Sequence, residues 1–330
     1  MSGRIAVVGA TGHLGRAVVP RCIAEGLFVC MIARHPPSDV PAGAEFITCD
    51  ATDTRALSRA LDGCSTVVNL MAGRSAAIEC IAKNLLTAIR LQRVARLVHV
   101  SSLAVFGARA GVFHEASKPC PNLSHRYAVS KVRAEKLLEP QLDTGRCVIL
   151  RPGCIYGRGA PVWTDSIGRL LVRGYLGDLG AAGAGIAPLV HVLDVADAIV
   201  AAINAPAGIY HVLNSEAISW NEYFRRFAYA LGIYVLPKLS STAWMIETWL
   251  RSPAILVHAR LAGYRPDVIT PAMRRLFASP ARIISRHPLC PRIPAGNRPQ
   301  AALADAAGAV RTHAAGERWR HVSTSAVDFT

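Results

Sequence analysis

A tyrosine and a lysine four residues apart are the first pair in this sequence that could do chemistry. They are Tyr127 and Lys131, in the stretch RYAVSKVRAEKLL. Residues at this spacing share one face of a helix. A phenol with a pKa of ~10 is a poor acid or base at neutral pH, but a nearby ammonium group favours the phenolate. Such a pair could exchange a proton with a substrate oxygen, although a surface helix can carry the same two residues by chance.

Two serines upstream could supply a second chemical group. Ser101 and Ser102 follow a predicted strand in VHVSSLAVFG. A hydroxyl group at the carboxyl edge of a sheet could donate a hydrogen bond to a carbonyl oxygen that is becoming an alkoxide. The alternative is that the two serines only end the strand.

Three glycines near the N-terminus indicate an anion-binding turn. Gly9, Gly12 and Gly15 separate the strand-like run Ile5–Val8 from a helical pattern over residues 12–24. Free N–H groups and the helix dipole at such a turn favour a phosphate, and the expected ligand is the pyrophosphate of a dinucleotide. The spacing is G-x-x-G-x-x-G, not G-x-G-x-x-G, and glycine needed only for packing is the alternative interpretation.

Strand-like and helical segments alternate around these residues. We predict strands at residues 4–9, 27–33, 45–49, 65–71, 96–101 and 146–151, and helices at 12–25, 53–62, 76–93 and 124–139. This alternation predicts a parallel sheet with helices on both faces. Later segments include a strand and helix over 189–203, a strand at 208–214 and a helix at 220–231. Several of them should form a smaller lobe over the carboxyl ends of the strands, where ligands bind in open α/β folds.

Composition limits the partners and the compartment. The 330 residues carry a formal charge of +15, but 32 of the 37 basic residues are arginines spread along the chain. We interpret this as compositional bias plus sites for phosphorylated small molecules, and we expect no nucleic acid partner. Nine cysteines without a C-x-x-C pair favour a reducing compartment over a disulfide framework. We expect no metal, no signal peptide and no transmembrane helix, and therefore a cytoplasmic protein.

Taken in order, several motifs resemble those of the extended short-chain dehydrogenase/reductases, the NAD(P)-dependent epimerase/dehydratase-like proteins. They are GATGHLG (9–15), CDATD (49–53), NLMAG (69–73), VSSLAVFG (100–107), YAVSK (127–131), RPGCIYG (151–157) and VHVLDVADAI (190–199). The resemblance covers about residues 4–231. It implies an α/β fold with a doubly wound parallel sheet of Rossmann type and a smaller C-terminal substrate lobe. It also implies an NAD(P)-dependent oxidoreductase.

The resemblance implies roles for particular residues. Ser102 would be the catalytic hydroxyl, Tyr127 the general acid/base, and Lys131 the group that lowers the tyrosine pKa and binds the nicotinamide ribose. The implied cofactor-binding residues are Gly9, Thr11, Gly12, His13, Leu14, Gly15, Arg34, Asp50, Ala51, Ala72, Gly73, Lys131, Pro152 and Gly153.

Two positions bear on the adenosine end of the cofactor. Asp50 resembles the aspartate that contacts the adenine, although an N-cap for a helix beginning near Thr52 is the alternative. The second predicted strand ends in Arg34 and His35, with no acid to bind the ribose 2′-hydroxyl of NAD. Because a guanidinium group can clamp a 2′-phosphate, NADP is favoured over NAD.

Two departures from the family pattern concern the substrate. Cys154 stands where members that act on nucleotide sugars often have asparagine, and Ala187 and Pro188 stand where they often carry an arginine for the diphosphate. A diphosphate without charge-assisted partners would bind poorly. We therefore favour a reductase or dehydrogenase for a less charged small-molecule substrate. A nucleotide-sugar epimerase or dehydratase and a non-catalytic NADP-binding assembly subunit are the alternatives.

The remaining expectations concern domain organisation. We predict an NAD(P)-binding domain over 1–155, to which 188–215 return, and a substrate lobe from 156–187 and 216–279. The apolar stretch 243–264 should form an amphipathic helix pair over a pocket, and residues 280–330 should form a poorly ordered tail without strands. Family relatives often dimerise through helices like 76–93 and 124–139, which implies a homodimer built on a four-helix bundle.

Overall fold

A computed structural model describes residues 3–73, 75–239, 269–285, 303–305, 307–308 and 310. Its main element is a seven-stranded parallel sheet in the order β11-β7-β5-β4-β1-β2-β3. The strands are β1 (Arg4–Val8), β2 (Phe28–Ala33), β3 (Ala44–Thr48), β4 (Thr66–Asn69), β5 (Arg96–Val100), β7 (Cys147–Pro152) and β11 (Gly208–Val212). The order runs outward in both directions from β1 and β4, which confirms the predicted doubly wound sheet of Rossmann type.

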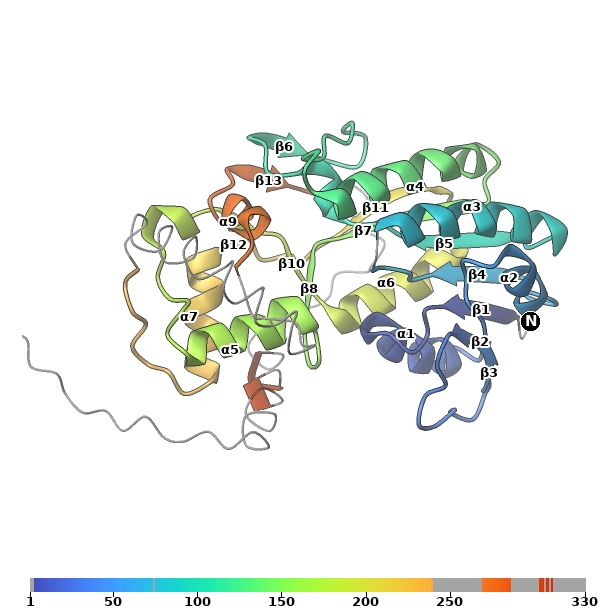
Figure 1. The fold of residues 1–330 in the computed structure, drawn as a ribbon, viewed down its shortest axis with the longest axis horizontal. Coiled ribbons are helices and arrows are strands. Elements are labelled where there is room, and N and C mark those ends of the chain that lie inside the picture. Colours follow the sequence, from blue (N-terminus) through green and yellow to red (C-terminus); the bar gives the residue numbers. More distant parts are fainter. Residues whose placement is uncertain are drawn as a thin grey trace, which may run out of the picture.

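Helices cover both faces of the sheet (Figure 1). One face carries α1 (His13–Ala24) and α6 (Val192–Asn204), and the other carries α2 (Thr54–Ala60), α3 (Ser75–Leu91) and α4 (Arg126–Asp143). The central strands are buried along their whole length because helices cover both faces, as parallel sheets require. The predicted strands and helices of this region are present within a few residues of their expected ends.

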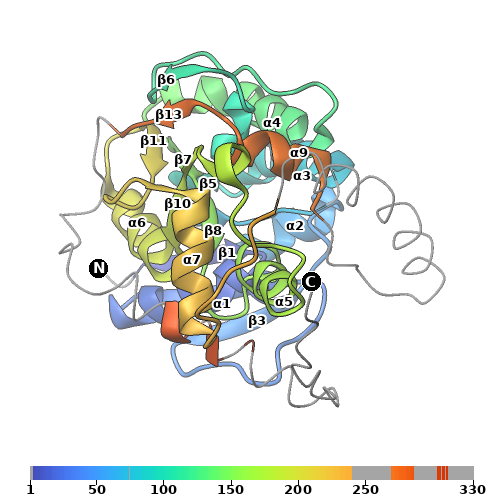
Figure 2. The ribbon, with the colours of Figure 1, turned by 90° about the vertical axis from the view of Figure 1, so that its left-hand side faces the viewer.

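A second, smaller lobe lies beyond the carboxyl ends of the strands (Figures 1 and 2). Its helical elements are η2 (Pro161–Ser166), α5 (Ile167–Val172), η3 (Gly180–Gly183), α7 (Trp220–Ala230) and α9 (Pro271–Phe277). Its short strands are β8 (Cys154–Tyr156), which pairs with β10 (Leu189–His191), and β9 (Ile186–Ala187), which pairs with β12 (Ile218–Ser219). An apolar core around Trp220, Tyr223 and Phe227 holds this lobe together.

One expectation about the C-terminal segment is wrong. We expected no strand after residue 280, but β13 (Ala281–Ile283) pairs in parallel with β6 (Gly111–Phe113), next to the 3₁₀ helix η1 (Leu103–Phe106). Ile283 packs in a small apolar cluster with Phe106 and Phe113, and this packing stabilises the strand pair. A strand of three residues is too short to show an alternating pattern in the sequence. The apolar stretch 243–264 and nearly all of the rest of the predicted tail lie outside the described residues.

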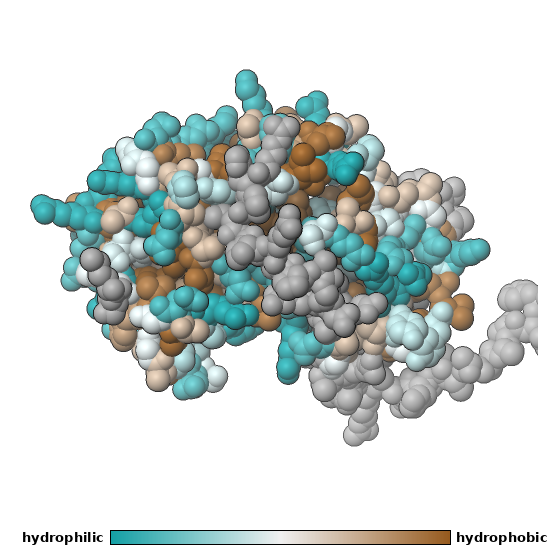
Figure 3. Space-filling view, turned by 180° about the vertical axis from the view of Figure 1, so that it is seen from behind, coloured by the Kyte–Doolittle hydropathy of each residue, from teal (hydrophilic) through white to brown (hydrophobic). Residues whose placement is uncertain are grey.

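Three observations concern surface and environment. Among the described residues, no helix is long and apolar enough to cross a bilayer. The eight cysteines in the described part of the chain are all free. Seen from behind, hydrophilic side chains are distributed over the surface and interrupted by hydrophobic ones (Figure 3).

Candidate active site

A cleft of about 1100 Å³ lies at the carboxyl ends of the strands. Pockets for small molecules usually hold about 300–1000 Å³, so this cleft has room for more than one small ligand. Every candidate catalytic and cofactor-binding residue lines it, from the glycine turn to Ser102, Tyr127 and Lys131. The structure therefore gathers into one site candidate residues that are spread over the sequence from Gly9 to Gly153.

The glycine turn has the geometry of an anion site. Gly9 has φ +90°, a left-handed conformation that favours glycine. A Cβ atom on Gly15 would lie 2.3 Å from the carbonyl oxygen of Ala10, so only glycine lets α1 approach β1 this closely. Gly12 is the N-cap of α1 and supplies no side-chain cap. The first N–H groups of the helix are thus left to a ligand, and the positive end of the helix dipole faces the cleft.

Arg34 and Asp50 lie at the end of the cleft expected to take the adenosine. Both side chains are exposed. Hydrogen bonds from the Thr52 N–H and hydroxyl group, 2.9 and 2.7 Å long, lower the pKa of Asp50, and the charge of Arg34 lowers it further. The alternative of a helix cap is wrong for Asp50, because Asp53 caps α2 by accepting bonds from the N–H groups of its first turn.

Tyr127 and Ser102 meet at the centre of the cleft. Burial raises the pKa of Tyr127, and a hydrogen bond with Ser102 acts in the opposite direction. The Ser102 Oγ accepts a bond of 3.2 Å from the N–H of Ala104, which orients the hydroxyl group at the start of η1. The two side chains come from α4 and from the loop after β5, so the sheet edge positions both.

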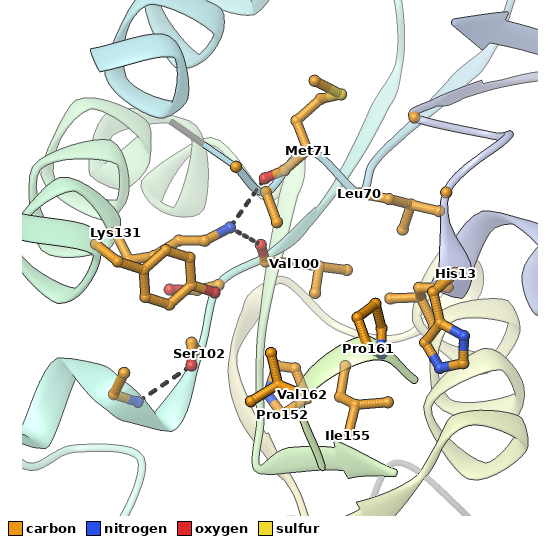
Figure 4. Close-up of a pocket in the computed structure, with 18 of the residues that line it drawn as sticks. His13, Leu70, Met71, Val100, Ser102, Lys131, Pro152, Ile155, Pro161 and Val162 are labelled. Atoms are coloured by element: carbon orange, nitrogen blue, oxygen red, sulfur yellow. Dashed lines mark hydrogen bonds between the residues drawn. The ribbon is translucent and has the colours of Figure 1, made fainter. Parts of the chain in front are cut away.

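Lys131 lies deepest in this group (Figure 4). Its Nζ is 5.8 Å from the centre of the Tyr127 ring. The ammonium group donates to two carbonyl oxygens, Met71 O at 3.1 Å and Val100 O at 2.8 Å. Burial lowers the pKa of Lys131 to about 8, and the charge of Glu135 opposes that effect. An ammonium group has three N–H donors, so one remains beyond these two bonds.

A buried ion pair fastens the helix that carries Tyr127 and Lys131. Arg151 on β7 binds Glu135 on α4 through two bonds, Nε to Oε1 at 3.0 Å and Nη2 to Oε2 at 2.7 Å. Glu135 is one helical turn beyond Lys131, so the bidentate pair fixes the helix face that points to the cleft. This pair was not predicted from the sequence, although Glu135 follows Tyr127 and Lys131 at helical spacing.

The remaining wall of the cleft is the candidate substrate half. It is mostly apolar, with a few polar groups, and its residues are Asn122, His125, Cys154, Val162, Trp163, Thr270, Met273, Arg275, Leu276 and Ile283. Burial and the charge of Arg275 lower the pKa of His125, so the two side chains are close enough to interact. Apart from Cys154, these residues were not predicted as site residues, because they come from loops and from the short elements η2, α9 and β13 and follow no motif that we recognised.

The described residues contain no group of three histidine, cysteine or acidic side chains placed to hold a metal ion.

Fold and cleft together define a dinucleotide-binding α/β protein with a tyrosine–lysine pair. The model of the NAD dependent epimerase/dehydratase family matches residues 5–214, more than half of the chain, and the chain belongs to that family. Family membership and the geometry of the glycine turn agree on NAD(P) as the cofactor that the cleft accommodates.

Similar proteins of this family have several activities. The chain is 30% identical over 174 residues to a dTDP-6-deoxy-L-talose 4-dehydrogenase (NAD(P)(+)) of Kitasatospora kifunensis, a match that covers 48% of this chain and 54% of that protein. It is 27% identical over 197 residues to a 2-alkyl-3-oxoalkanoate reductase of Shewanella oneidensis, which covers 54% and 50%. A 66-residue match at 42% identity, covering 20% of this chain, reaches only 8% of an uncharacterised protein of Mycobacterium tuberculosis. The chain thus spans about half the length, or less, of these curated relatives.

A solved structure extends the similarity to most of the chain. A UDP-glucose 4-epimerase of Thermus thermophilus, solved in complex with NAD, is 25% identical with a TM-score of 0.58. The match covers 83% of this chain and 97% of that one. Proteins named as an epimerase, a dehydrogenase and a reductase are therefore all similar to this chain.

Proposed function

We propose that the protein is an NADP-dependent oxidoreductase that interconverts a carbonyl compound and the corresponding alcohol. The observation that carries the proposal is the meeting of Ser102, Tyr127 and Lys131 in the cleft that also contains the glycine turn. When bound, the nicotinamide cofactor supplies or accepts the hydride. The protein has to bind the substrate oxygen and supply or accept the proton.

Ser102 and Tyr127 would perform that proton chemistry. The Ser102 hydroxyl would donate a hydrogen bond to the substrate oxygen and stabilise the alkoxide character of the transition state. The Tyr127 phenol would give its proton to that oxygen in reduction and take it back in oxidation. Since burial raises the pKa of Tyr127, the protonated phenol is the form ready for reduction at neutral pH.

Lys131 would set the balance between phenol and phenolate. Its charge lies 5.8 Å from the Tyr127 ring centre and favours the phenolate form when the proton leaves. Lys131 would also bind the nicotinamide ribose through its remaining N–H donor. Ala72, Gly73, Pro152 and Gly153 would line the cofactor along the same wall.

Arg34 supports NADP over NAD. Its exposed guanidinium group stands at the end of β2 beside Asp50, where a 2′-phosphate would find a charge-assisted partner. Asp50, held in a tight turn by Thr52, would contact the adenine.

The first experiment is a fluorescence titration with NADPH and NADH. Wild type should bind NADPH about tenfold more tightly, the size of one charge-assisted contact. Arg34→Ala should lose that preference, whereas Arg55→Ala, an exposed arginine outside the cleft, should keep it. Equal affinities in wild type, or an unchanged preference in Arg34→Ala, would contradict the NADP assignment.

The substrate half favours a largely apolar carbonyl compound. Val162, Trp163, Met273 and Leu276 provide apolar surface in the cleft that holds Tyr127, and β9 ends without the arginine expected for a nucleotide diphosphate. A similar protein named as a 2-alkyl-3-oxoalkanoate reductase supports this class. Turnover of aliphatic ketones and 3-oxo acids with NADPH, and none with nucleotide sugars, is the expected result of a substrate screen.

One observation favours a second candidate function. Arg275 lines the cleft with an exposed guanidinium group that could bind a phosphate. A nucleotide-sugar epimerase or dehydratase, in which the cofactor stays bound through each cycle, would need such a residue. Cofactor that co-purifies with the protein, together with conversion of a UDP- or dTDP-sugar, would decide for this alternative.

We also propose a homodimer formed through α3 and α4. The family resemblance supports this proposal, and within one chain the two helices already lie side by side, packed through the small residues Ala82 and Ala134. Light scattering of the purified protein should give twice the mass of the 35.2 kDa chain. A mass of one chain at micromolar concentration would contradict this proposal.

A further inference from the structure

Two polar residues buried beneath Lys131 have no part in the chemistry described above. Asn69 ends β4 and is 2% exposed, and His99 on β5 is 1% exposed. Polar side chains are rarely this buried without a partner. The two residues are directly opposite each other in the parallel ladder, as its last pair.

The hydrogen bonds fix how the two side chains are oriented. The Oδ1 of Asn69 accepts a bond of 3.1 Å from the N–H of Met71. Because a backbone N–H can only donate, the amide NH₂ of Asn69 must face His99, and its Nδ2 is 2.9 Å from the His99 Nδ1. An NH₂ group donates, so Nδ1 accepts and the imidazole is neutral with its proton on Nε2. Burial and the nearby charge of Lys131 lower the pKa of His99, which agrees with a neutral ring.

Asn69 and His99 are close in sequence to the two residues whose carbonyl groups bind Lys131. Met71 is two residues after Asn69, and Val100 is the residue after His99. Their carbonyl oxygens accept the 3.1 and 2.8 Å bonds from the Lys131 Nζ (Figure 4). The Asn69–His99 hydrogen bond links the ends of β4 and β5. The bond from the Met71 N–H to Asn69 fixes the orientation of the backbone just after β4. The two oxygens therefore converge on one ammonium group.

We propose that Asn69 and His99 are positioning residues for Lys131, which act by fixing the Met71 and Val100 carbonyl groups that bind its ammonium. The pair acts through the backbone and touches neither substrate nor cofactor. The inference rests on the proposed role of Lys131 in the site.

The groups that face Lys131 come from two elements. Tyr127 and Glu135 lie one turn away on either side along α4, and His99 faces it from β5. Glu135 is occupied by Arg151. The two carbonyl dipoles are thus the contacts that favour the charged ammonium from the sheet side, and their alignment should set how readily Lys131 loses its proton.

The test is a direct titration of Lys131, which needs neither substrate nor cofactor. The chain has five lysines, so the side-chain signals of full-length protein labelled with ¹³C-lysine can be followed by NMR, and Lys131→Met assigns its signal. Asn69→Leu and His99→Leu should each lower the titration midpoint of Lys131 by about one pH unit, the size expected when a hydrogen bond to a charged group is lost. His99→Gln keeps an acceptor for Asn69 and should restore the wild-type midpoint.

Asn84→Leu is the matched control. Asn84 is also buried and also hydrogen-bonded to the backbone, through its NH₂ group to Ala51 O at 3.0 Å, but it makes no hydrogen bond with Lys131 or its two carbonyl partners. If leucine at position 69 prevents folding, Asn69→Ser makes the same test, because its hydroxyl is too short to hold both Met71 and His99. An unchanged Lys131 midpoint in folded Asn69 and His99 variants, or an equal shift in Asn84→Leu, would overturn the proposal. Since no turnover is measured, a wrong assignment of substrate or reaction leaves this result intact.

Discussion

The two halves of the cleft are built in different ways. The cofactor half is formed by backbone at the ends of β1, β2, β4 and β7, with glycines at Gly9 and Gly15 where nothing larger fits. The substrate half is formed by side chains from η2, α9 and the loop before α4, several of them apolar. A backbone-built site constrains the residue type at each position, whereas a side-chain-built site can change its ligand by single substitutions. The comparison explains why relatives with different substrates share one fold.

The largest expected effect concerns Tyr127, where the two halves meet. Tyr127→Phe removes the hydroxyl group that exchanges the proton, and turnover should fall by about 10³-fold. Cofactor binding should stay nearly unchanged, because the ring and its packing remain. Steady-state kinetics and a NADPH titration on the same preparation check both parts. Substantial turnover by the phenylalanine variant would remove Tyr127 from the mechanism.

The next effect concerns the backbone-built half. Gly15→Ala places a methyl group 2.3 Å from the carbonyl oxygen of Ala10, and neither backbone segment can yield without moving α1. We expect a loss of about 3 kcal/mol in the free energy of unfolding, at the upper end for overpacked sites, and weak cofactor binding. Urea unfolding and the NADPH titration measure the two.

Gly208→Ala is the control for that substitution. Gly208 begins the edge strand β11, and its added methyl group would meet only the Tyr210 ring at 3.4 Å, an ordinary contact distance. Its stability should stay close to that of wild type. Equal stability of the two alanine variants would mean that the helix–strand contact at Gly15 is not as constrained as the geometry indicates.

The sequence predicted where the residues of the backbone-built half lie, at the sheet edge that lines the cleft. Glycine spacing, strand length and the order of motifs placed Gly15, Arg34, Asp50 and Lys131 at one sheet edge, because parallel strands bring their carboxyl ends together. Asp50 illustrates the limit, since local spacing alone could not show that Asp53, three residues later, takes the helix cap. Local hydrogen bonds decide the assignment, because Asp53 accepts from the N–H groups of Arg55 and Ala56, whereas Asp50 accepts from Thr52.

The substrate half could not be predicted in the same way. Arg275 and Trp163 reach the cleft only through the packing of short elements whose positions depend on the whole second lobe. The β13 strand was missed for a similar reason, because its three residues pair with β6 from a distant part of the chain. Long-range packing leaves no local period in the sequence.

Lys131 is buried between the two halves of the cleft. Its lowered pKa predicts that the stability of the protein depends on pH. Its pKa is about 8 in the folded protein and near 10.4 in an unfolded chain. Between these values the unfolded state binds more protons, so the free energy of unfolding should rise with pH across this window, by about 3 kcal/mol from this residue. Burial raises the pKa of Tyr127, so this phenol acts in the opposite direction from about pH 10 upward, where the unfolded tyrosine ionises.

Lys131→Met provides the reference for that measurement. Urea unfolding is measured at several pH values between those two pKa values. The free energy of unfolding of wild type should rise with pH relative to that of the methionine variant, and the difference between the two curves is the contribution of Lys131. Parallel curves would show that the ammonium group is not destabilised by burial. They would mean that the hydrogen bonds to the Met71 and Val100 carbonyl groups fully offset the desolvation of the ammonium group.

The smallest expected effect belongs to the side-chain-built half. Arg275 is exposed and acts through water-screened charge, so Arg275→Ala should raise KM for an anionic substrate only about tenfold, and less at high salt. A neutral ketone of similar size should be unaffected, and Arg109→Ala, an exposed arginine that does not line the cleft, should change neither value. Equal KM values for the anionic substrate in Arg275→Ala and wild type would leave the apolar wall around Trp163 and Met273 as the determinant of specificity. A loss much larger than tenfold, seen with a nucleotide sugar, would instead make Arg275 a diphosphate ligand and move the epimerase or dehydratase function ahead of the reductase.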